Sequence, residues 1–173
     1  IAIGGKKEEQ LKYAQEKLGK EITLEEVFKE GQQLDIHAVT KGKGFQGPVK
    51  RFGVSLKARK SEKGKRSVGS LGPWKAQGHI MWKVAHAGKM GYHARTEYNK
   101  QLVKIGKNVE EINVKGGYLN YGLVKNPYIL LKGSIPGVNK RIIRMSTSRR
   151  PNKNIVEDPL DVQYVSLESK QGN

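Results

Sequence analysis

The sequence contains no cysteine among its 173 residues, which excludes disulfide bonds and thiol chemistry. It also has no run of about 20 apolar residues, so we expect no transmembrane helix. Residues 1–10 lack the apolar stretch that a signal peptide requires. These absences favour a cytoplasmic protein that has no membrane partner.

Acidic residues are also scarce. The chain has 16 Asp and Glu against 33 Lys and Arg, which gives a formal charge of +17 and an isoelectric point near 10.0. Residues 41–107 alone hold 17 basic side chains and only two acidic ones, Glu62 and Glu97. Charge of this density is costly unless a polyanion neutralises it, and an isoelectric point above about 9 is typical of nucleic-acid-binding domains.

Regular structure is predicted on both sides of this basic segment. A helix is predicted over residues 6–18, and a short second helix follows Thr23, which forms a capping-box pattern with Glu26. The alternation of residues 34–40 is typical of a strand. Further short strands are predicted over residues 112–115, 118–124, 128–132, 141–146 and 162–167. We therefore expect a mainly β protein of the α+β class, with its strands in a small barrel or sandwich.

Three segments follow from this pattern. Residues 1–40 form a helical segment and a barrel strand, and residues 108–173 supply the remaining strands and a C-terminal tail. Between them, periodicity fades from residue 41 to about residue 107, and glycines punctuate the chain. Long irregular segments are functional or disordered. We expect this one to be an extended arm that becomes ordered on a partner.

The motifs that suggest an enzyme are weak. Residues 42–47 have the GxGxxG form of a nucleotide-binding loop. In dinucleotide-binding folds a helix starts inside this motif, but Pro48 and the basic stretch after it argue against a helix here. No acidic residue stands about 20 positions later at the end of a second strand, where this fold needs one, and the kinase catalytic loops are absent.

Three histidines, His79, His86 and His93, are spaced by seven residues and could suggest zinc. No cysteine accompanies them, and the surrounding lysines would repel a cation. We expect no metal, cofactor or catalytic residue.

The basic arm combines three kinds of group that bind RNA. Lys and Arg neutralise phosphates, glycines let the backbone approach a polyanion, and aromatic rings stack on unpaired bases. Trp74 follows a Gly-Pro turn with no apolar neighbour after Leu71, which favours a stacking role. Trp82 lies beside Ile80 and Met81 and is interpreted as a core residue.

A series of motifs runs from residue 39 to residue 137. Val39-Thr-Lys-Gly-Lys-Gly-Phe-Gln-Gly47 is followed by Lys50-Arg51-Phe52-Gly53, Gly72-Pro-Trp74, Met90-Gly-Tyr-His-Ala-Arg-Thr-Glu97 and Lys132-Gly-Ser-Ile-Pro-Gly137. In this order the motifs resemble the C-terminal portion of the ribosomal large-subunit protein three family, in its archaeal branch. The resemblance covers at least residues 31–150.

The resemblance implies a translation-protein-type β-barrel, here incomplete at its N-terminus, with an extension that reaches through ribosomal RNA toward the peptidyl-transferase centre. It also implies binding to large-subunit RNA early in assembly. Trp74 matches the tryptophan at the tip of that extension, near the acceptor end of the incoming transfer RNA. Two positions differ from eukaryotic members. Glu62 replaces a histidine, so modification there does not carry over, and residues 75–79 contain a one-residue insertion.

We therefore predict a structural constituent of the large ribosomal subunit, with ribosomal RNA and neighbouring large-subunit proteins as partners and no small-molecule substrate. The alternatives are a free-standing RNA-binding module outside the ribosome and a nucleotide-dependent enzyme that uses residues 42–47. The residues predicted to bind RNA are Lys41, Lys43, Phe45, Gln46, Lys50, Arg51, Arg59, Lys60, Lys63, Lys65, Arg66, Trp74, Lys75, His79, Lys83, Lys89, His93, Arg95, Arg149 and Arg150.

Overall fold

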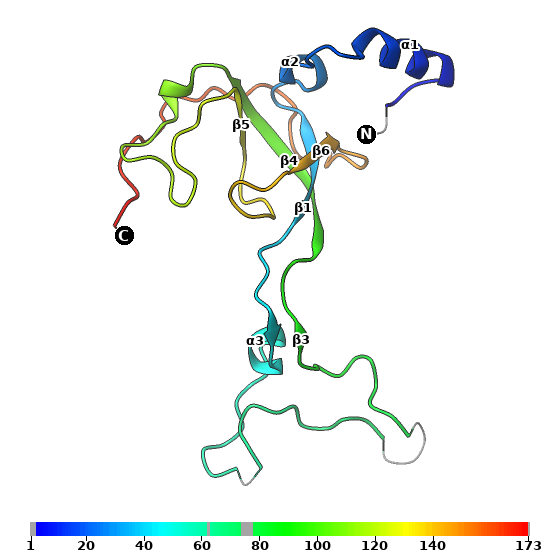
Figure 1. Cartoon of the computed structure of the whole chain (residues 1–173), viewed down its shortest axis with the longest axis vertical. Helices are drawn as coiled ribbons and strands as arrows, with labels where there is room; N and C mark the ends of the chain where they lie inside the picture. The colour runs from blue at the N-terminus through cyan, green and yellow to red at the C-terminus, as the bar shows by residue number, and fades with distance from the viewer. Residues whose placement is uncertain (1–2, 62, 74–77, 173) are drawn as a thin grey trace. The chain divides into compact units, whose positions relative to one another are not determined.

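The chain divides into two compact units, each built from segments that are far apart in the sequence. The computed structural model describes residues 3–61, 63–73 and 78–172. Unit 1 comprises residues 1–36, 97–135 and 145–173, and unit 2 comprises residues 37–96 and 136–144. Figure 1 follows the path of the chain through both units.

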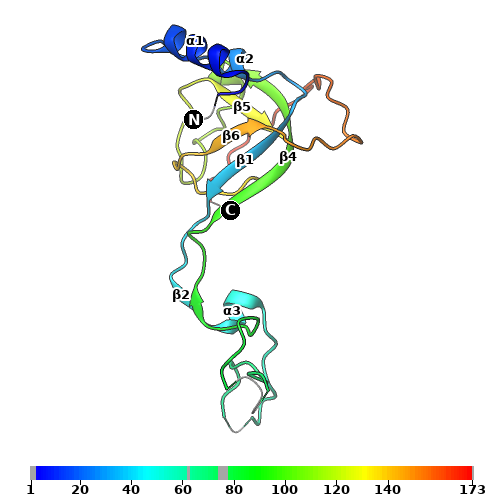
Figure 2. The same cartoon turned by 90° about the vertical axis from the view of Figure 1, so that its right-hand side faces the viewer.

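Four strands form the main sheet, in the order β5-β4-β1-β6. They are β1 (Gln33–Val39), β4 (Ala94–Gly106), β5 (Tyr128–Leu131) and β6 (Arg144–Thr147), and Figure 2 shows them side by side. The strands β4 and β5 pair antiparallel, with Ile105 opposite Ile129. The protein is thus mainly β, with an open sheet and a few short helices.

The core of unit 1 lies on this sheet. Leu34 of β1 and Leu102 of β4 are completely buried and pack with Phe28. Partly buried hydrophobic residues complete the cluster: Ile105, Ile129, Leu131 and Met145. Residues from four separate parts of the sequence therefore depend on one another for burial.

Two helices precede the sheet and bury no side chain. They are α1 (Lys7–Lys17) and α2 (Leu24–Val27). Thr23 is the N-cap of α2, and its hydroxyl donates a hydrogen bond to the Glu26 carboxylate at 3.2 Å. The Lys17 ammonium donates to Glu26 at 2.5 Å, which raises the pKa of Lys17 and lowers the pKa of Glu26. No helix among the described residues is long and apolar enough to cross a membrane.

A buried carboxylate on β1 fixes two neighbouring segments of unit 1. Asp35 is 2% exposed, and its two oxygens accept hydrogen bonds from the backbone amides of Asn99 and Arg149, both at 3.1 Å. Gln33 similarly accepts from the amide of Asn152 at 2.9 Å. Because buried polar side chains need hydrogen-bond partners, Asp35 and Gln33 hold the loop that follows β6.

Several expectations from the sequence are confirmed and others are wrong. The two helices and the strands over residues 34–40 and 128–132 are present, and the strand expected over 141–146 is β6, at 144–147. Regular structure begins earlier than expected after the arm, because β4 starts at Ala94.

The other expected strands are not formed. Residues 112–115 and 162–167 form no strand. They are linked by a hydrogen bond from the Lys115 amide to the Leu167 carbonyl, without the repeated pairing of a ladder. Residues 118–124 form only an isolated bridge, and residues 109–111 form the 3₁₀ helix η1 (Val109–Glu111).

Candidate nucleic-acid interface

Nearly all of the net charge belongs to unit 2. Its sequence holds 17 Lys and Arg residues and one acidic residue, Glu62, which leaves +16, whereas the 16 basic and 15 acidic residues of unit 1 leave +1. Four Lys–Glu ion pairs are formed between described residues, and all four lie in unit 1. One carboxylate cannot balance 17 cations, so unit 2 carries an uncompensated positive charge of the kind that attracts polyanions.

Two segments of unit 2 pair to form a ribbon, residues 40–46 with residues 88–93. Its strands are β2 (Phe45–Gln46) and β3 (Gly88–Lys89), which run antiparallel with Phe45 opposite Lys89. The Lys43 amide donates to the Met90 carbonyl, and the Met90 amide donates to the Gly44 carbonyl, both at 2.9 Å. The ribbon thus brings lysines from two distant parts of the sequence together.

A short helix, α3 (Pro48–Phe52), follows the ribbon and is tied back to it. The guanidinium of Arg51 donates to the His86 carbonyl at 2.8 Å. A Cβ at Gly88 would lie 2.7 Å from the Arg51 guanidinium, so the absence of a side chain there makes room for it. Arg51 therefore has a positioning role in addition to its predicted role in RNA binding.

The helix α3 corrects one expectation from the sequence. A helix was not expected after the GxGxxG pattern, yet proline is compatible with the first helical position, where its missing amide costs nothing. The helix has only five residues and ends at Gly53, whose φ is 69°. It connects to an antiparallel ribbon, whereas a dinucleotide fold places it between parallel strands.

A concave surface, which we call the ribbon hollow, lies between the ribbon and the C-terminal end of α3. Its volume is about 470 Å³, which lies within the range of ligand sites. No acidic residue lines it. The lining comprises six residues predicted from the sequence, Lys41, Lys43, Arg51, Lys89, His93 and Arg95, together with Thr40, Phe52, Met90 and Gly91.

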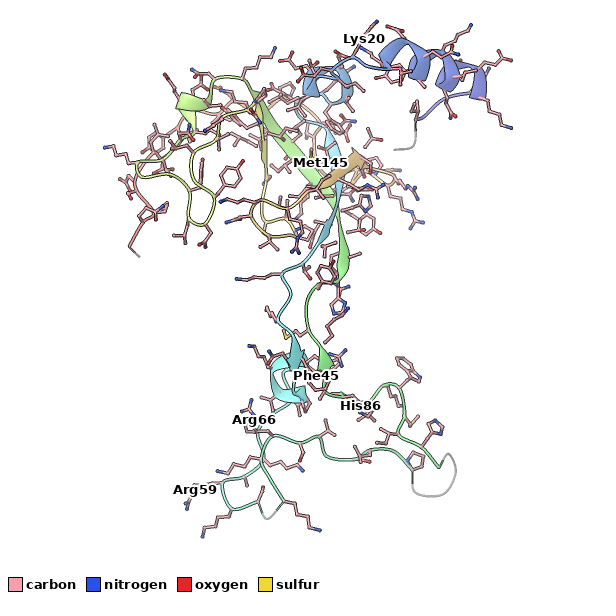
Figure 3. All side chains as sticks on the ribbon, viewed as in Figure 1. Lys20, Phe45, Arg59, Arg66, His86 and Met145 are labelled. Carbon is pink, nitrogen blue, oxygen red and sulfur yellow. The ribbon has the colours of Figure 1, made fainter. Side chains whose placement is uncertain are left out.

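A second, shallower hollow involves the basic loop after α3. Its lining includes Pro48, Lys65, Arg66 and His86. The loop folds back on itself, because the Lys57 amide donates to the Lys65 carbonyl at 3.1 Å and the Lys57 ammonium donates to the Ser67 hydroxyl at 3.0 Å. Figure 3 shows Arg59 extending away from this loop.

The remaining predicted residues do not line the ribbon hollow. Phe45 is 77% exposed, and the side-chain amide of Gln46 donates to the Lys43 carbonyl at 2.6 Å. Trp74 and Lys75 lie outside the described residues. Arg149 and Arg150 belong to unit 1. The others are exposed in unit 2: Lys50, Arg59, Lys60, Lys63, His79 and Lys83.

The interpretation of Trp82 as a core residue is wrong. Its side chain is 91% exposed, because apolar neighbours in the sequence do not supply packing partners from other segments. Among the described residues, no three His, Asp or Glu side chains cluster as metal ligands.

Two residues of this surface were not selected from the sequence. Phe52 lines the ribbon hollow and is 56% exposed. Arg141 lies over the ring of Tyr92 at 5.6 Å and donates to the Thr40 carbonyl at 3.4 Å. The motif Lys50-Arg51-Phe52-Gly53 was a signal for Phe52, but the position of Arg141 follows only from the fold of residues 136–144 into unit 2.

We expect Gly91→Ala to open the ribbon. A Cβ at residue 91 would lie 2.0 Å from the Lys41 carbonyl oxygen, and the backbone there has φ of 73°. Gly44→Ala is the matched control, since Gly44 has φ of 67° but a methyl group added there would meet no atom within 4 Å. Hydrogen exchange at the Lys43 and Met90 amides should accelerate at least tenfold more in Gly91→Ala than in Gly44→Ala. A tenfold difference corresponds to about 1.4 kcal/mol in the free energy of opening the ribbon. Equal exchange in the two variants would contradict the close approach.

Comparison with known proteins gives a consistent result. The family model described as Ribosomal protein L3 matches residues 2–172. Proteins named large ribosomal subunit protein uL3 are similar to the chain. The one from Archaeoglobus fulgidus is 56% identical over 172 residues, covering 98% of this chain and 51% of the relative. The one from Methanocaldococcus jannaschii is 50% identical over 175 residues, covering 99% and 52%. The chain thus spans about half the length of the curated relatives that it matches.

Proposed function

Because the chain belongs to the ribosomal protein L3 family, we propose that it is a structural constituent of the large ribosomal subunit and binds large-subunit ribosomal RNA. The family is one of structural ribosomal proteins and not of enzymes. The observation that carries the proposal is the charge of +16 on unit 2, whose sequence offers a single carboxylate.

The proposed mechanism is phosphate neutralisation by a preformed basic surface. Each Lys or Arg that contacts a phosphate releases counterions, which provides affinity without reading the base sequence. The ribbon supplies Lys41, Lys43 and Lys89 in one hollow. Because backbone hydrogen bonds already hold the ribbon, little ordering is needed when RNA binds.

The family membership supports three finer proposals. Residues 41–107 include the RNA-binding extension, which reaches toward the peptidyl-transferase centre of the cytoplasmic ribosome. The open sheet β5-β4-β1-β6 is part of a translation-protein-type β-barrel that contacts neighbouring ribosomal proteins. Binding occurs early in assembly of the subunit.

The test is the affinity of the chain for large-subunit ribosomal RNA across a salt series. We expect log affinity to fall with log salt with a slope of about −5 or steeper, and we expect preference over generic duplex RNA. Absence of salt-dependent binding would contradict the proposal. A steep slope without preference, and without co-sedimentation with large subunits, would instead favour an RNA-binding module outside the ribosome.

A further inference from the structure

The ribbon hollow has two chemically different sides. Five Lys and Arg side chains and His93 give it cationic character, while Phe52 and Met90 add apolar surface. Phosphate binding alone would not require an aromatic ring. Phe52 is 56% exposed although it is a large hydrophobic residue at the end of a helix. An exposed aromatic beside cations is the combination that binds an unpaired base with its phosphate.

The shape of the hollow is held by contacts that do not use its free cations. Arg51 reaches from α3 to the His86 carbonyl at 2.8 Å, and its guanidinium lies 4.9 Å from the ring centre of Phe52. Arg51 therefore ties α3 to the segment that precedes β3 and also packs on the Phe52 ring. On the ribbon side of the hollow, the absence of a side chain at Gly91 allows the close approach of the Lys41 carbonyl. The hollow is consequently formed before any ligand enters it.

The volume of the hollow is compatible with a single nucleotide, and its aromatic side chain favours an unpaired one. A volume of about 470 Å³ falls within the roughly 300–1,000 Å³ of small-molecule sites, whereas bases stacked inside an RNA duplex cannot be reached by an aromatic side chain. Only a nucleotide that leaves the stack, at a bulge or in a single strand, presents both its base and its phosphate to such a surface.

We propose that the ribbon hollow holds one unpaired nucleotide of the bound RNA. The base packs against Phe52, and the phosphates are bound by four cations that line the hollow, Lys41, Lys43, Lys89 and Arg95. This inference rests on the proposed RNA-binding function and adds selectivity for RNA structure to it. If charge alone determined the affinity, the chain would bind duplex and bulged RNA according to the number of phosphates that each offers. A preference for the bulge therefore isolates the contribution of the base.

The experiment measures binding of the chain to three fluorescent RNA hairpins with the same stem, by anisotropy at several salt concentrations. One stem is fully paired, one has a single bulged adenosine, and one has an abasic nucleotide at the bulge. We expect the adenosine bulge to bind at least about fivefold more tightly than the abasic bulge, as for one stacked base. The backbone bend is common to both bulged hairpins, so it does not contribute to this ratio.

Phe52→Leu should abolish that ratio and leave the salt slope unchanged, since no charge is removed. Tyr164→Leu is the control, because Tyr164 is an exposed aromatic residue, 79% accessible, in unit 1. Lys43→Gln should weaken binding to all three hairpins and make the salt slope shallower by about 1. Circular dichroism and urea unfolding would show that each variant retains its fold.

The outcomes separate the two proposals. If the chain binds none of the hairpins and no ribosomal RNA in a salt-dependent way, the proposed RNA-binding function fails. If it binds all three hairpins with the same affinity, or if Phe52→Leu keeps the preference for the adenosine bulge, the nucleotide site is overturned while phosphate binding stands.

Discussion

Leu102→Ala is expected to lower the free energy of unfolding by about 3–5 kcal/mol, the range for removing a large aliphatic side chain from a core. Leu102 is completely buried on β4 and packs with Leu34 and Phe28. The backbone of Leu102 also holds the two residues that precede β1. Its amide donates to the Gln32 carbonyl, and its carbonyl accepts from the Gly31 amide, both at 2.8 Å. The cavity left by the variant cannot close without moving these backbone segments.

Urea unfolding monitored by far-ultraviolet circular dichroism measures this effect. Leu123→Ala is the matched control, because Leu123 is 58% exposed in the same unit, and it should change stability by less than about 0.5 kcal/mol. Similar small losses in both variants would show that Leu102 does not belong to a packed core. The total stability of a domain is only about 5–15 kcal/mol, so the Leu102 variant should be largely unfolded at modest urea concentration.

Replacement of four ribbon-hollow cations by glutamine is expected to reduce RNA affinity by about two to three orders of magnitude near physiological salt. The variant carries Lys41→Gln, Lys43→Gln, Lys89→Gln and Arg95→Gln. All four side chains are exposed and line the same hollow. Loss of four phosphate contacts should make the salt slope shallower by about 3, and the reduced slope identifies the loss as electrostatic.

The matched control removes the same charge from unit 1. It carries Lys12→Gln, Lys20→Gln, Lys115→Gln and Lys125→Gln, four exposed lysines that take part in none of the four Lys–Glu ion pairs. Both variants lower the formal charge from +17 to +13. If they weaken binding to the same extent, net charge alone governs affinity and the hollow has no special role. A slope change confined to the ribbon-hollow variant would place the phosphate contacts there.

The sequence predicted elements whose signal is local. The strand β1 follows from alternation in one short stretch, and the helix α2 follows from the Thr23–Glu26 pattern. Residues 112–115 have the same kind of alternation, and Ile112 and Val114 are buried, yet no strand forms. Alternation reports burial on one side of a segment, whereas a ladder also requires a partner with continuous pairing.

The basic surface could be assigned to a segment but not to a shape. Six predicted residues meet in the ribbon hollow because residues 40–46 pair with residues 88–93 across a long loop. Nothing in the local sequence specifies that register. The placement of Arg141 beside Tyr92 depends similarly on a segment some 50 positions further along the chain. The prediction for Trp82 was wrong for the converse reason. Its apolar neighbours are local in the sequence, and its side chain is 91% exposed.

The loop between α3 and β3 has a consequence for the lifetime of the chain. Between Gly53 and Ala87 the described residues form no helix or strand. Seven of them are exposed residues that proteases of trypsin specificity recognise, and six of these lie close together: Lys57, Arg59, Lys60, Lys63, Lys65 and Arg66, with Lys83 further along. Exposed, irregular segments are preferred sites of proteolytic cleavage.

Limited digestion with trypsin should therefore cut the free chain first between residues 57 and 66, and bound RNA should slow the cut. Initial cleavage in α1 at an equal rate would contradict this order. If this loop binds RNA as proposed, protein made in excess of its RNA would be degraded through that same loop, and the supply of RNA would set how much of the protein survives.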